Sequence, residues 1–216
     1  MVWLGGDDPG YTAMTLLAIR STPVPLNVEV GAALPRSDEE LYEFCARNPE
    51  LRIERTAKGD LIVMTPAGGE SGHRTLEIAV ALGLWARHDG TGVAFDSSAG
   101  FLLPNGALRA PDAAWVTRSK LEPLSPEEKQ RFLPLCPDFV VELRSPSDRL
   151  GDLRAKMEEY RQHGARLGWL IDPEARRVHV YRPGRPVEVL EDPTEVAGDP
   201  ELPGFLLDLG PVWESL

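Results

Sequence analysis

The sequence predicts an α/β or α+β fold in which helices flank a mixed β-sheet. Three observations lead to this class: a hairpin pattern over 51–64, a long helical pattern over about 70–88, and a strand–helix–strand–strand order over 139–181. Strands that alternate with helices in this way pack as layers. The length of 216 residues suits one globular domain. We expect an N-terminal arm at 1–35, a single domain at 36–212 and a short tail at 213–216.

The first elements follow from capping and turn residues. Ser37 precedes three acidic residues and predicts the start of a short helix that ends near Asn48. The hairpin over 51–64 breaks at Lys58-Gly59-Asp60. A helix from about Glu70 to His88 should stop at Gly90, and short strands should follow near 92–95, 101–103 and 113–117.

The second half continues this order. Residues 119–137 form a polar excursion with a short helix opened by Ser125-Pro126. The apolar run 139–143 predicts a buried strand, and the segment Ser145-Pro146-Ser147-Asp148 predicts the cap of a helix over about 150–163. Strands are expected at 168–171 and 177–181, and the stretch from 183 onward holds strand material at 187–190 before a Pro/Gly-rich end.

Composition restricts the class of protein. The 23 basic and 34 acidic residues give a net charge of −11, which opposes indiscriminate adhesion to nucleic acid or to anionic membranes. Two cysteines are too few for a disulfide framework or a zinc-ligand set, so we expect a reducing, cytoplasmic location. No signal peptide or membrane helix is expected. The preference for arginine over lysine and the 20 prolines fit either a heat-adapted protein or high-GC codon bias.

The helix over 70–88 carries the first candidate residues. Leu76, Val80, Gly83 and Leu84 form its expected buried stripe, and His73 and Glu77 fall within that same stripe. A carboxylate on a buried face requires a partner. The functional interpretation is a site acid with a neighbouring histidine. The structural alternative is a capping glutamate and a hydrogen-bonded histidine.

Glu142 is the most informative residue because it interrupts a buried apolar strand. A charge there costs several kcal/mol unless it is paired or binds a metal, and an ion pair with a neighbouring arginine is the structural alternative. Two Pro-Asp steps offer a second metal ligand, at Asp112 and at Asp138. Asp138 lies about 13 Å from Glu142 along one strand, too far for one Mg²⁺. Asp112 can reach Glu142 from an adjacent strand.

The helix after the Glu142 strand carries Asp152, Lys156 and Tyr160 on one face. A surface Asp–Lys pair of little energetic value is the structural alternative. The functional hypothesis places the Lys156 ammonium over the two carboxylates, where it would orient water or stabilise a pentacovalent phosphate.

These residues together resemble a known family. Pro111-Asp112 followed by Glu142 in an apolar strand, with a glutamate on an upstream helix, resembles the PD-(D/E)XK nuclease superfamily. More closely, about residues 37–212 resemble its bacterial restriction endonuclease-like proteins. The resemblance is carried by Lys58-Gly59-Asp60 with its following strand, His73, Pro111-Asp112, Val141-Glu142-Leu-Arg-Ser-Pro-Ser-Asp148, Lys156 with Tyr160, and Trp169-Leu-Ile-Asp172-Pro.

The resemblance implies a restriction-endonuclease-like fold, with Mg²⁺ (or Mn²⁺) bound by Asp112 and Glu142 and with Glu77 as the helical acid. The sequence departs from the family pattern at Arg144, where the superfamily has lysine. Because arginine does not deprotonate and is no substitute for a compact ammonium, the lysine role would pass to Lys156.

We therefore expect a Mg²⁺-dependent DNA endonuclease. Two other classes stay open: a nuclease-like fold that serves as a non-catalytic nucleic-acid-binding or regulatory module, and a metal-dependent phosphoesterase acting on small substrates. DNA is the expected partner, and a homodimer is expected because cutting both strands needs two sites. Residues 142–185 carry a charge of +3 against −14 for the rest of the chain. The candidate phosphate contacts there are Arg144, Arg149 and Arg154, with Arg161 and Arg166 beyond them. A solvated helix face is the structural alternative.

Overall fold

The computed structural model describes residues 17–20, 35, 37–49, 51–64, 66–214 and 216. The chain divides into two compact units: Met1–Pro66 with Asn105–Arg109, and Ala67–Pro104 with Ala110–Leu216. The domain expected over 36–212 is thus distributed over both units. Apart from residues 17–20 and 35, the expected arm at 1–35 lies outside the described residues.

The first unit is a small sheet with one helix. Helix α1 (Asp38–Arg47) begins as predicted at Ser37, whose side chain accepts the Glu40 N–H at 3.1 Å. Strands β2 (Arg52–Arg55) and β3 (Leu61–Met64) form the predicted antiparallel hairpin, and its turn places Gly59 at φ +90°. Two strands were not expected: β1 (Leu17–Arg20), parallel to β3, and β6 (Leu108–Arg109), antiparallel to β2. Each is short and pairs with residues distant in sequence, so no local pattern indicates it.

The second unit is built on a six-stranded mixed sheet with the strand order β11-β10-β9-β8-β7-β4. Only β8 and β9 run parallel within it, and the other neighbours are antiparallel. The mixed sheet confirms the predicted fold class. Its strands are β4 (Gly92–Asp96), β7 (Ala113–Thr117), β8 (Phe139–Leu143), β9 (Leu167–Asp172), β10 (Arg177–Tyr181) and β11 (Glu188–Glu191).

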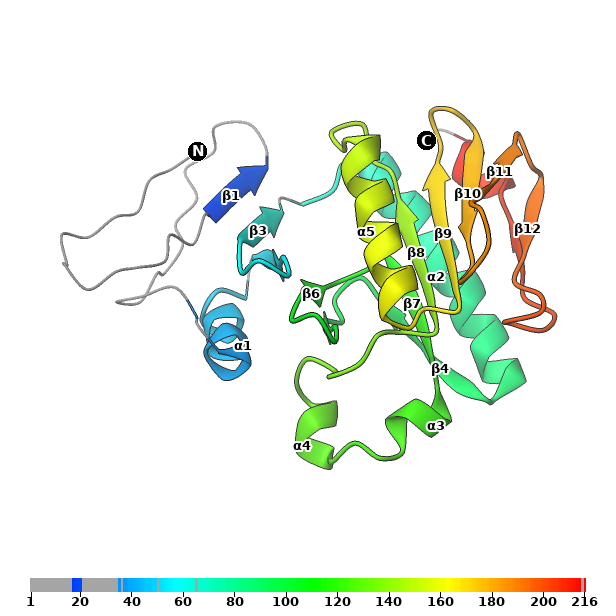
Figure 1. Ribbon diagram of the computed structural model, residues 1–216. Helices are drawn as coiled ribbons and strands as arrows, with labels where there is room; N and C mark the ends of the chain where they lie inside the picture. Colours follow the sequence, from blue (N-terminus) through cyan, green and yellow to red (C-terminus); the bar gives the residue numbers. More distant parts are fainter. Residues whose placement is uncertain (1–16, 21–34, 36, 50, 65, 215) are drawn as a thin grey trace. The chain divides into compact units, whose positions relative to one another are not determined.

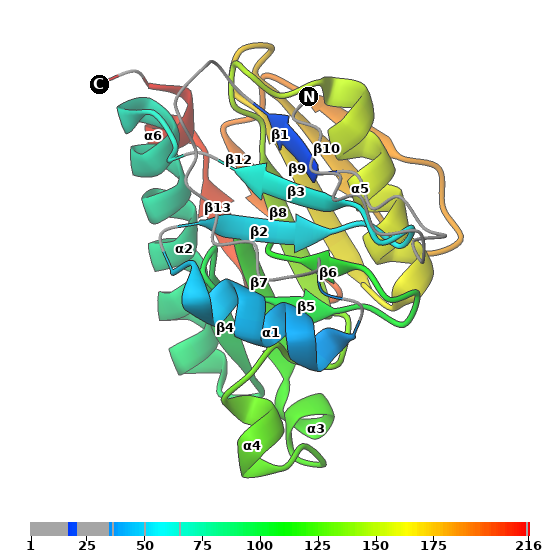
Figure 2. The ribbon, with the colours of Figure 1, turned by 90° about the vertical axis from the view of Figure 1, so that its left-hand side faces the viewer.

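Two helices cover opposite faces of this sheet. Helix α5 (Leu150–His163) lies on one face and α2 (Gly69–Asp89) on the other (Figures 1 and 2). Because side chains alternate along a strand, Val141 of β8 joins the core cluster that includes Ile78 of α2. The neighbouring positions Val140 and Glu142 therefore face α5.

The buried face of α2 differs from the one predicted. Leu76, Val80 and Leu84 are 58%, 48% and 61% exposed. The helix instead packs through the buried residues Ile78, Leu82 and Ala86. Both faces are apolar enough to be buried, and the sheet selects the second. The bounds of the helix and its end at Gly90, which has φ +73°, are as predicted.

The start of α5 also differs from the prediction. Its N-cap is Arg149, which makes no side-chain capping hydrogen bond. The Asp148 carboxylate instead accepts hydrogen bonds from the backbone N–H and the hydroxyl of Ser145, at 2.9 and 2.6 Å. The segment 145–148 therefore closes a tight turn in front of the helix. Gly164 ends the helix as expected.

The remaining elements of the second unit complete its core. The excursion after β7 contains α3 (Arg118–Leu121) and the predicted helix α4 (Pro126–Lys129), and β5 (Phe101–Leu102) bridges to Leu133. The C-terminal region packs through β12 (Glu195–Ala197), β13 (Leu206–Asp208) and α6 (Gly210–Trp213). Phe205 stacks on Trp169, with ring centroids 5.5 Å apart. No helix among the described residues is long and apolar enough to cross a membrane.

Candidate active site

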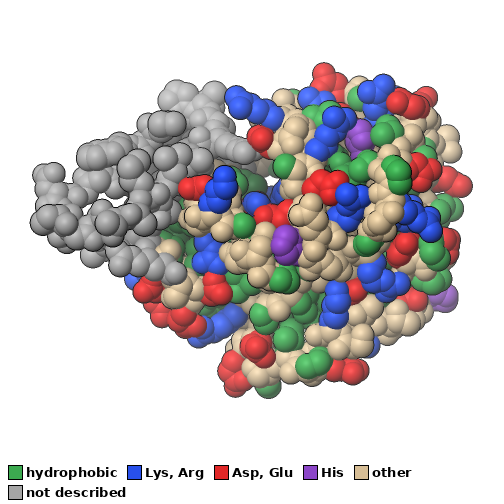
Figure 3. Space-filling view, viewed as in Figure 1, with side chains coloured by type: hydrophobic (Ala, Val, Ile, Leu, Met, Phe, Trp, Pro, Cys, Tyr) green, Lys and Arg blue, Asp and Glu red, His purple; other side chains and the backbone are tan. Residues whose placement is uncertain are grey.

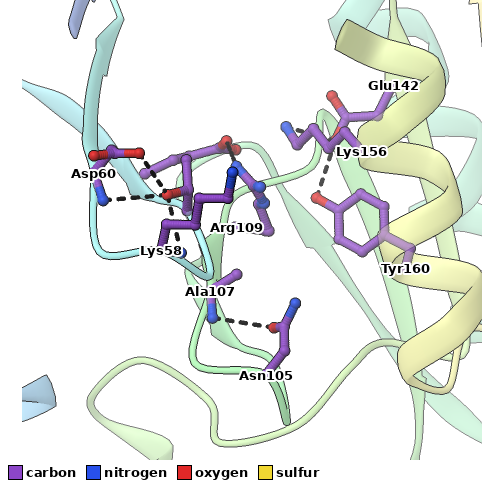
Figure 4. A network of polar contacts seen from close by, with 10 residues as sticks. Lys58, Asp60, Asn105, Ala107, Arg109, Glu142, Lys156 and Tyr160 are labelled. Atoms are coloured by element: carbon purple, nitrogen blue, oxygen red, sulfur yellow. Dashed lines mark hydrogen bonds and ion pairs between the residues drawn. The ribbon is translucent and has the colours of Figure 1, made fainter. Parts of the chain in front are cut away.

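Glu142 is the one charged residue of β8, a strand whose five residues are all buried. Its side chain is 5% exposed, and its Oε1 lies 2.8 Å from the Lys156 Nζ. The Tyr160 hydroxyl donates a hydrogen bond to the same oxygen at 3.0 Å. Figure 4 shows the lysine and the tyrosine side by side on α5, both directed at the glutamate. The buried charge is therefore compensated by a cation and a hydroxyl from the helix above it.

Gly168 of β9 lies beneath α5, against Met157 of that helix. A Cβ at this position would lie 2.5 Å from the Met157 Cε and 3.3 Å from a Val140 methyl. Met157 and Tyr160 are buried, whereas the Lys156 side chain keeps 13% of its surface exposed. Gly168 thus leaves room for the Met157 side chain, on the same helix that brings Lys156 and Tyr160 to Glu142.

Asp112 stands at the position opposite Glu142. The antiparallel register pairs Ala113 with Val141, which places the preceding residue, Asp112, across from Glu142. The Asp112 Oδ2 accepts the backbone N–H of Leu143 at 2.8 Å. That nitrogen is about 2.4 Å from the Glu142 Cα by covalent geometry, so the aspartate oxygen lies within about 5 Å of the glutamate backbone. The structure therefore places Asp112, just before β7, across from Glu142 of β8.

Arg144, at the lysine position of the superfamily pattern, is directed away from Asp112. Its Nη1 lies 2.9 Å from the Asp172 Oδ2 and 3.4 Å from the Glu174 Oε2. Asp172 is 2% exposed and belongs to β9, on the side of β8 away from β7. Arg144 thus compensates a buried carboxylate, and the ammonium beside Glu142 comes from Lys156.

Asp138, the alternative metal ligand set aside above, has structural partners. Its side chain is 4% exposed and lies 3.0 Å from the Lys120 Nζ. It also accepts the backbone N–H of Thr117 at 2.9 Å. These contacts are at the opposite end of β8 from Glu142.

Glu77 and His73 lie on the other face of the sheet. Both are on α2, each about 40% exposed, and the His73 Nδ1 is 3.9 Å from the Glu77 Oε1. Within the described part of the chain, no three His, Cys, Asp or Glu side chains are grouped to hold a metal ion. The structure therefore does not bring Glu77 to Asp112 and Glu142, and its metal role stays a sequence-based prediction that the site proposed below does not use.

His179 is a further buried group on the α5 face. It is 3% exposed in β10, and its Nε2 meets no hydrogen-bond partner within the part of the chain that the structure describes. Burial is the main cause that lowers its pKa below the usual 6.5, and the charge of Arg154 lowers it further. The interior of the sheet therefore disfavours the charged form of His179.

The remaining predicted basic residues are at the surface. Arg149 and Arg154 are exposed at the beginning of α5. On the face that bears α5, basic and acidic side chains are interspersed (Figure 3). Any binding of DNA would thus depend on individual side chains more than on a broad positive surface.

The sequence did not reveal two features that hold the site. One is the N–H of Leu143, which fixes the Asp112 side chain, and the other is Asp172, the partner of Arg144. In the first unit, the buried pair of Glu54 and Arg109, 3.1 Å apart, was also missed. Charged residues inside short apolar strands indicate that a buried ion pair exists. Their partners depend on strand register, which the sequence does not give directly.

A mixed sheet with an aspartate and a glutamate on adjacent strands, beneath a helix that supplies a lysine, places this protein in the restriction-endonuclease-like class. Residues 38–210 match the model of the Uma2 family, described as "Putative restriction endonuclease", and the chain belongs to that family. The resemblance found in the sequence is thereby confirmed.

A solved structure supports the same fold. The chain is similar to a protein from Anabaena variabilis described as "a putative nuclease belonging to DUF820", with a TM-score of 0.67 and 21% sequence identity. The similarity covers 83% of this chain and 98% of the other. At 21% identity, the similarity supports the fold alone. No curated protein matches the chain.

Proposed function

We propose that this protein is a Mg²⁺-dependent DNA endonuclease that hydrolyses phosphodiester bonds. The observation that carries the proposal is the pairing of Asp112 and Glu142 across β7 and β8, with Lys156 held 2.8 Å from Glu142. Two acids and a lysine at one point of a mixed sheet are the parts that metal-assisted phosphodiester hydrolysis requires.

The chemistry of the two acids fits a small divalent cation. Mg²⁺ prefers oxygen ligands, keeps several waters and is commonly held by one or two carboxylates. Directly opposed residues of an antiparallel pair have Cβ atoms about 4.5–5.5 Å apart, so Asp112 and Glu142 can share one ion. When bound, the ion would supply Lewis-acid activation of the phosphodiester and of water.

Lys156 and Tyr160 have distinct roles in this proposal. The Lys156 ammonium compensates Glu142 and, because its side chain remains partly exposed, can donate to a phosphate oxygen as negative charge develops there. Tyr160 is buried and holds the Glu142 carboxylate through its hydroxyl. We regard Lys156 as a catalytic residue and Tyr160 as a positioning residue.

The substrate would be held from the exposed part of α5. Arg149 and Arg154 lie at its beginning and are suited to phosphate contacts. Arg144 is not used here, because it compensates the buried Asp172. A homodimer is part of the proposal, since one site per chain cuts one strand of a duplex.

A supercoiled-plasmid assay tests the proposal. Wild type should nick or linearise the plasmid with Mg²⁺ or Mn²⁺ and not with EDTA. Glu142→Ala and Asp112→Asn should abolish cleavage, and Lys156→Ala should lower it by about tenfold or more. The matched control is Glu195→Gln, which removes an exposed carboxylate from β12 and should cleave normally. Full cleavage by Glu142→Ala would end the hypothesis.

A non-catalytic nucleic-acid-binding or regulatory module is the second candidate. It is favoured by the net charge of −11 and by the arginine at the usual lysine position. Binding of DNA fragments without cleavage in any divalent cation would support it. A phosphoesterase acting on small substrates would instead hydrolyse a chromogenic phosphodiester while leaving plasmid intact.

A further inference from the structure

Helix α2 has two apolar faces, and among the described residues only one of them is packed. Leu82 and Ile78 are fully buried against the sheet. Val80 lies two residues from Leu82, which is about 200° around the helix at 100° per residue. The stripe of Leu76, Val80 and Leu84 thus lies opposite the packed face.

The exposure of this stripe is unusual for a surface helix. Its three side chains are 48–61% exposed and recur every four residues, so they form one continuous line. A surface helix normally presents polar residues on the face away from the core. A contiguous apolar line on the outside indicates an interaction surface.

We propose that this stripe is the interface of a homodimer in which α2 packs antiparallel against α2 of a second copy. The charges along the helix select this partner and this direction. Glu70 and Glu77 lie in the first half, and Arg87 and His88 lie in the last turn. Two further charges on the helix have partners within the chain: Arg74 binds Glu70 and the Glu214 carbonyl, and Asp89 accepts from Thr91. An antiparallel pair places the acidic half of one copy against the basic end of the other, whereas a parallel pair opposes like charges.

The geometry follows from a two-fold axis at Val80. Leu76 then faces Leu84 of the second copy, and Arg87 faces His73, between Glu70 and Glu77 of the second copy. A Cβ added at Gly83 would meet no atom within 4 Å, so this glycine leaves room for close approach of the backbones. The same patch thus serves both partners, as an isologous interface requires. Antiparallel helix dipoles also favour the arrangement.

The size of the helix sets the expected affinity. A helix of 21 residues is about 31 Å long and offers roughly 300 Å² to a partner at a contact width of about 10 Å. Specific stable dimers bury about 800 Å² per partner. The α2 pair alone therefore belongs to the weak class, and we expect dissociation in the micromolar range.

Sedimentation equilibrium of the full chain tests the interface. Chain concentrations from about 1 to about 300 µM bracket the micromolar dissociation constant expected for a small interface. Wild type should show a monomer–dimer equilibrium. Val80→Glu should weaken it by at least about tenfold, because two like charges meet at the axis. The matched control, Val189→Glu, makes the same change at a residue that is 43% exposed in β11, and should dimerise as wild type does.

Charge exchange tests the antiparallel direction. Arg87→Glu and Glu77→Arg should each weaken the dimer, and the double exchange should restore it. In a parallel pair each of these residues would face its own counterpart, so the single changes would leave like charges opposed and dimerisation largely unchanged. A wild type that stays monomeric, or a dimer that Val80→Glu leaves intact, would overturn the proposal. Unchanged circular dichroism melting of each variant shows that the fold is intact. None of these measurements depends on nuclease activity.

Discussion

Replacing Lys156 by methionine tests the electrostatics of the site. The change keeps an unbranched side chain, one atom shorter, and removes an ammonium 2.8 Å from the Glu142 Oε1. At this separation, attraction amounts to about 6 kcal/mol with an effective dielectric constant of about 20. Desolvation offsets part of it, and loss of one partner of a buried pair costs about 3–5 kcal/mol. Because Tyr160 still donates to Glu142, we expect about 3 kcal/mol, or a Tm lower by about 6–12 °C.

The assay is urea unfolding followed by circular dichroism, in EDTA and in Mg²⁺. The double variant Lys156→Met/Glu142→Gln should lose less unfolding free energy than the two single variants lose in sum, because it leaves no uncompensated charge. If both cations use Glu142, Mg²⁺ should stabilise Lys156→Met more than wild type. A loss below about 1 kcal/mol for Lys156→Met, or additive single losses, would refute this account of the pair.

Three further predictions concern single side chains. Arg144→Met should lower the unfolding free energy by about 3 kcal/mol, because it strands the buried carboxylate of Asp172, and the added change Asp172→Asn should recover part of this loss in urea unfolding. In EDTA, Asp112→Asn should melt at or above wild type, since the amide oxygen can still accept the Leu143 N–H while repulsion with the neighbouring glutamate disappears; a large drop in Tm would contradict this. Burial lowers the pKa of His179 in the folded protein, so the unfolded state takes up the proton at a higher pH. The unfolding free energy should therefore fall as the pH drops below about 6.5, by up to about 1.4 kcal/mol per pH unit for one group. His179→Phe should flatten that slope between about pH 7.5 and 5.5, and an unchanged slope would exclude this histidine as the cause.

Local chemistry explains which elements could be predicted from the sequence. The Ser37 cap, the Gly59 turn and the Gly90 stop act within a few residues, so their helix and hairpin follow from short patterns. The buried face of α2 could not be chosen in this way, because Leu76 and Leu82 are equally apolar and only the sheet distinguishes their environments.

The same division applies to the site. Glu142 could be identified because a charge in an apolar run is a local anomaly. The position of Asp112 depended on the assumption that its strand is adjacent, which the register supports. The pairing of Arg144 with Asp172 spans 28 residues and two strands. This contact follows from the register of β8 against β9, which composition and periodicity do not predict.

The packing of α5 on the sheet ties the candidate site to the integrity of that helix. Asp112 and Glu142 are positioned by β7 and β8, whereas Lys156 is carried by α5. A chain in which α5 has come away from the sheet would carry the two acids without their ammonium. If the protein is a nuclease, its activity would therefore report on the packing of α5 as well as on the integrity of the sheet.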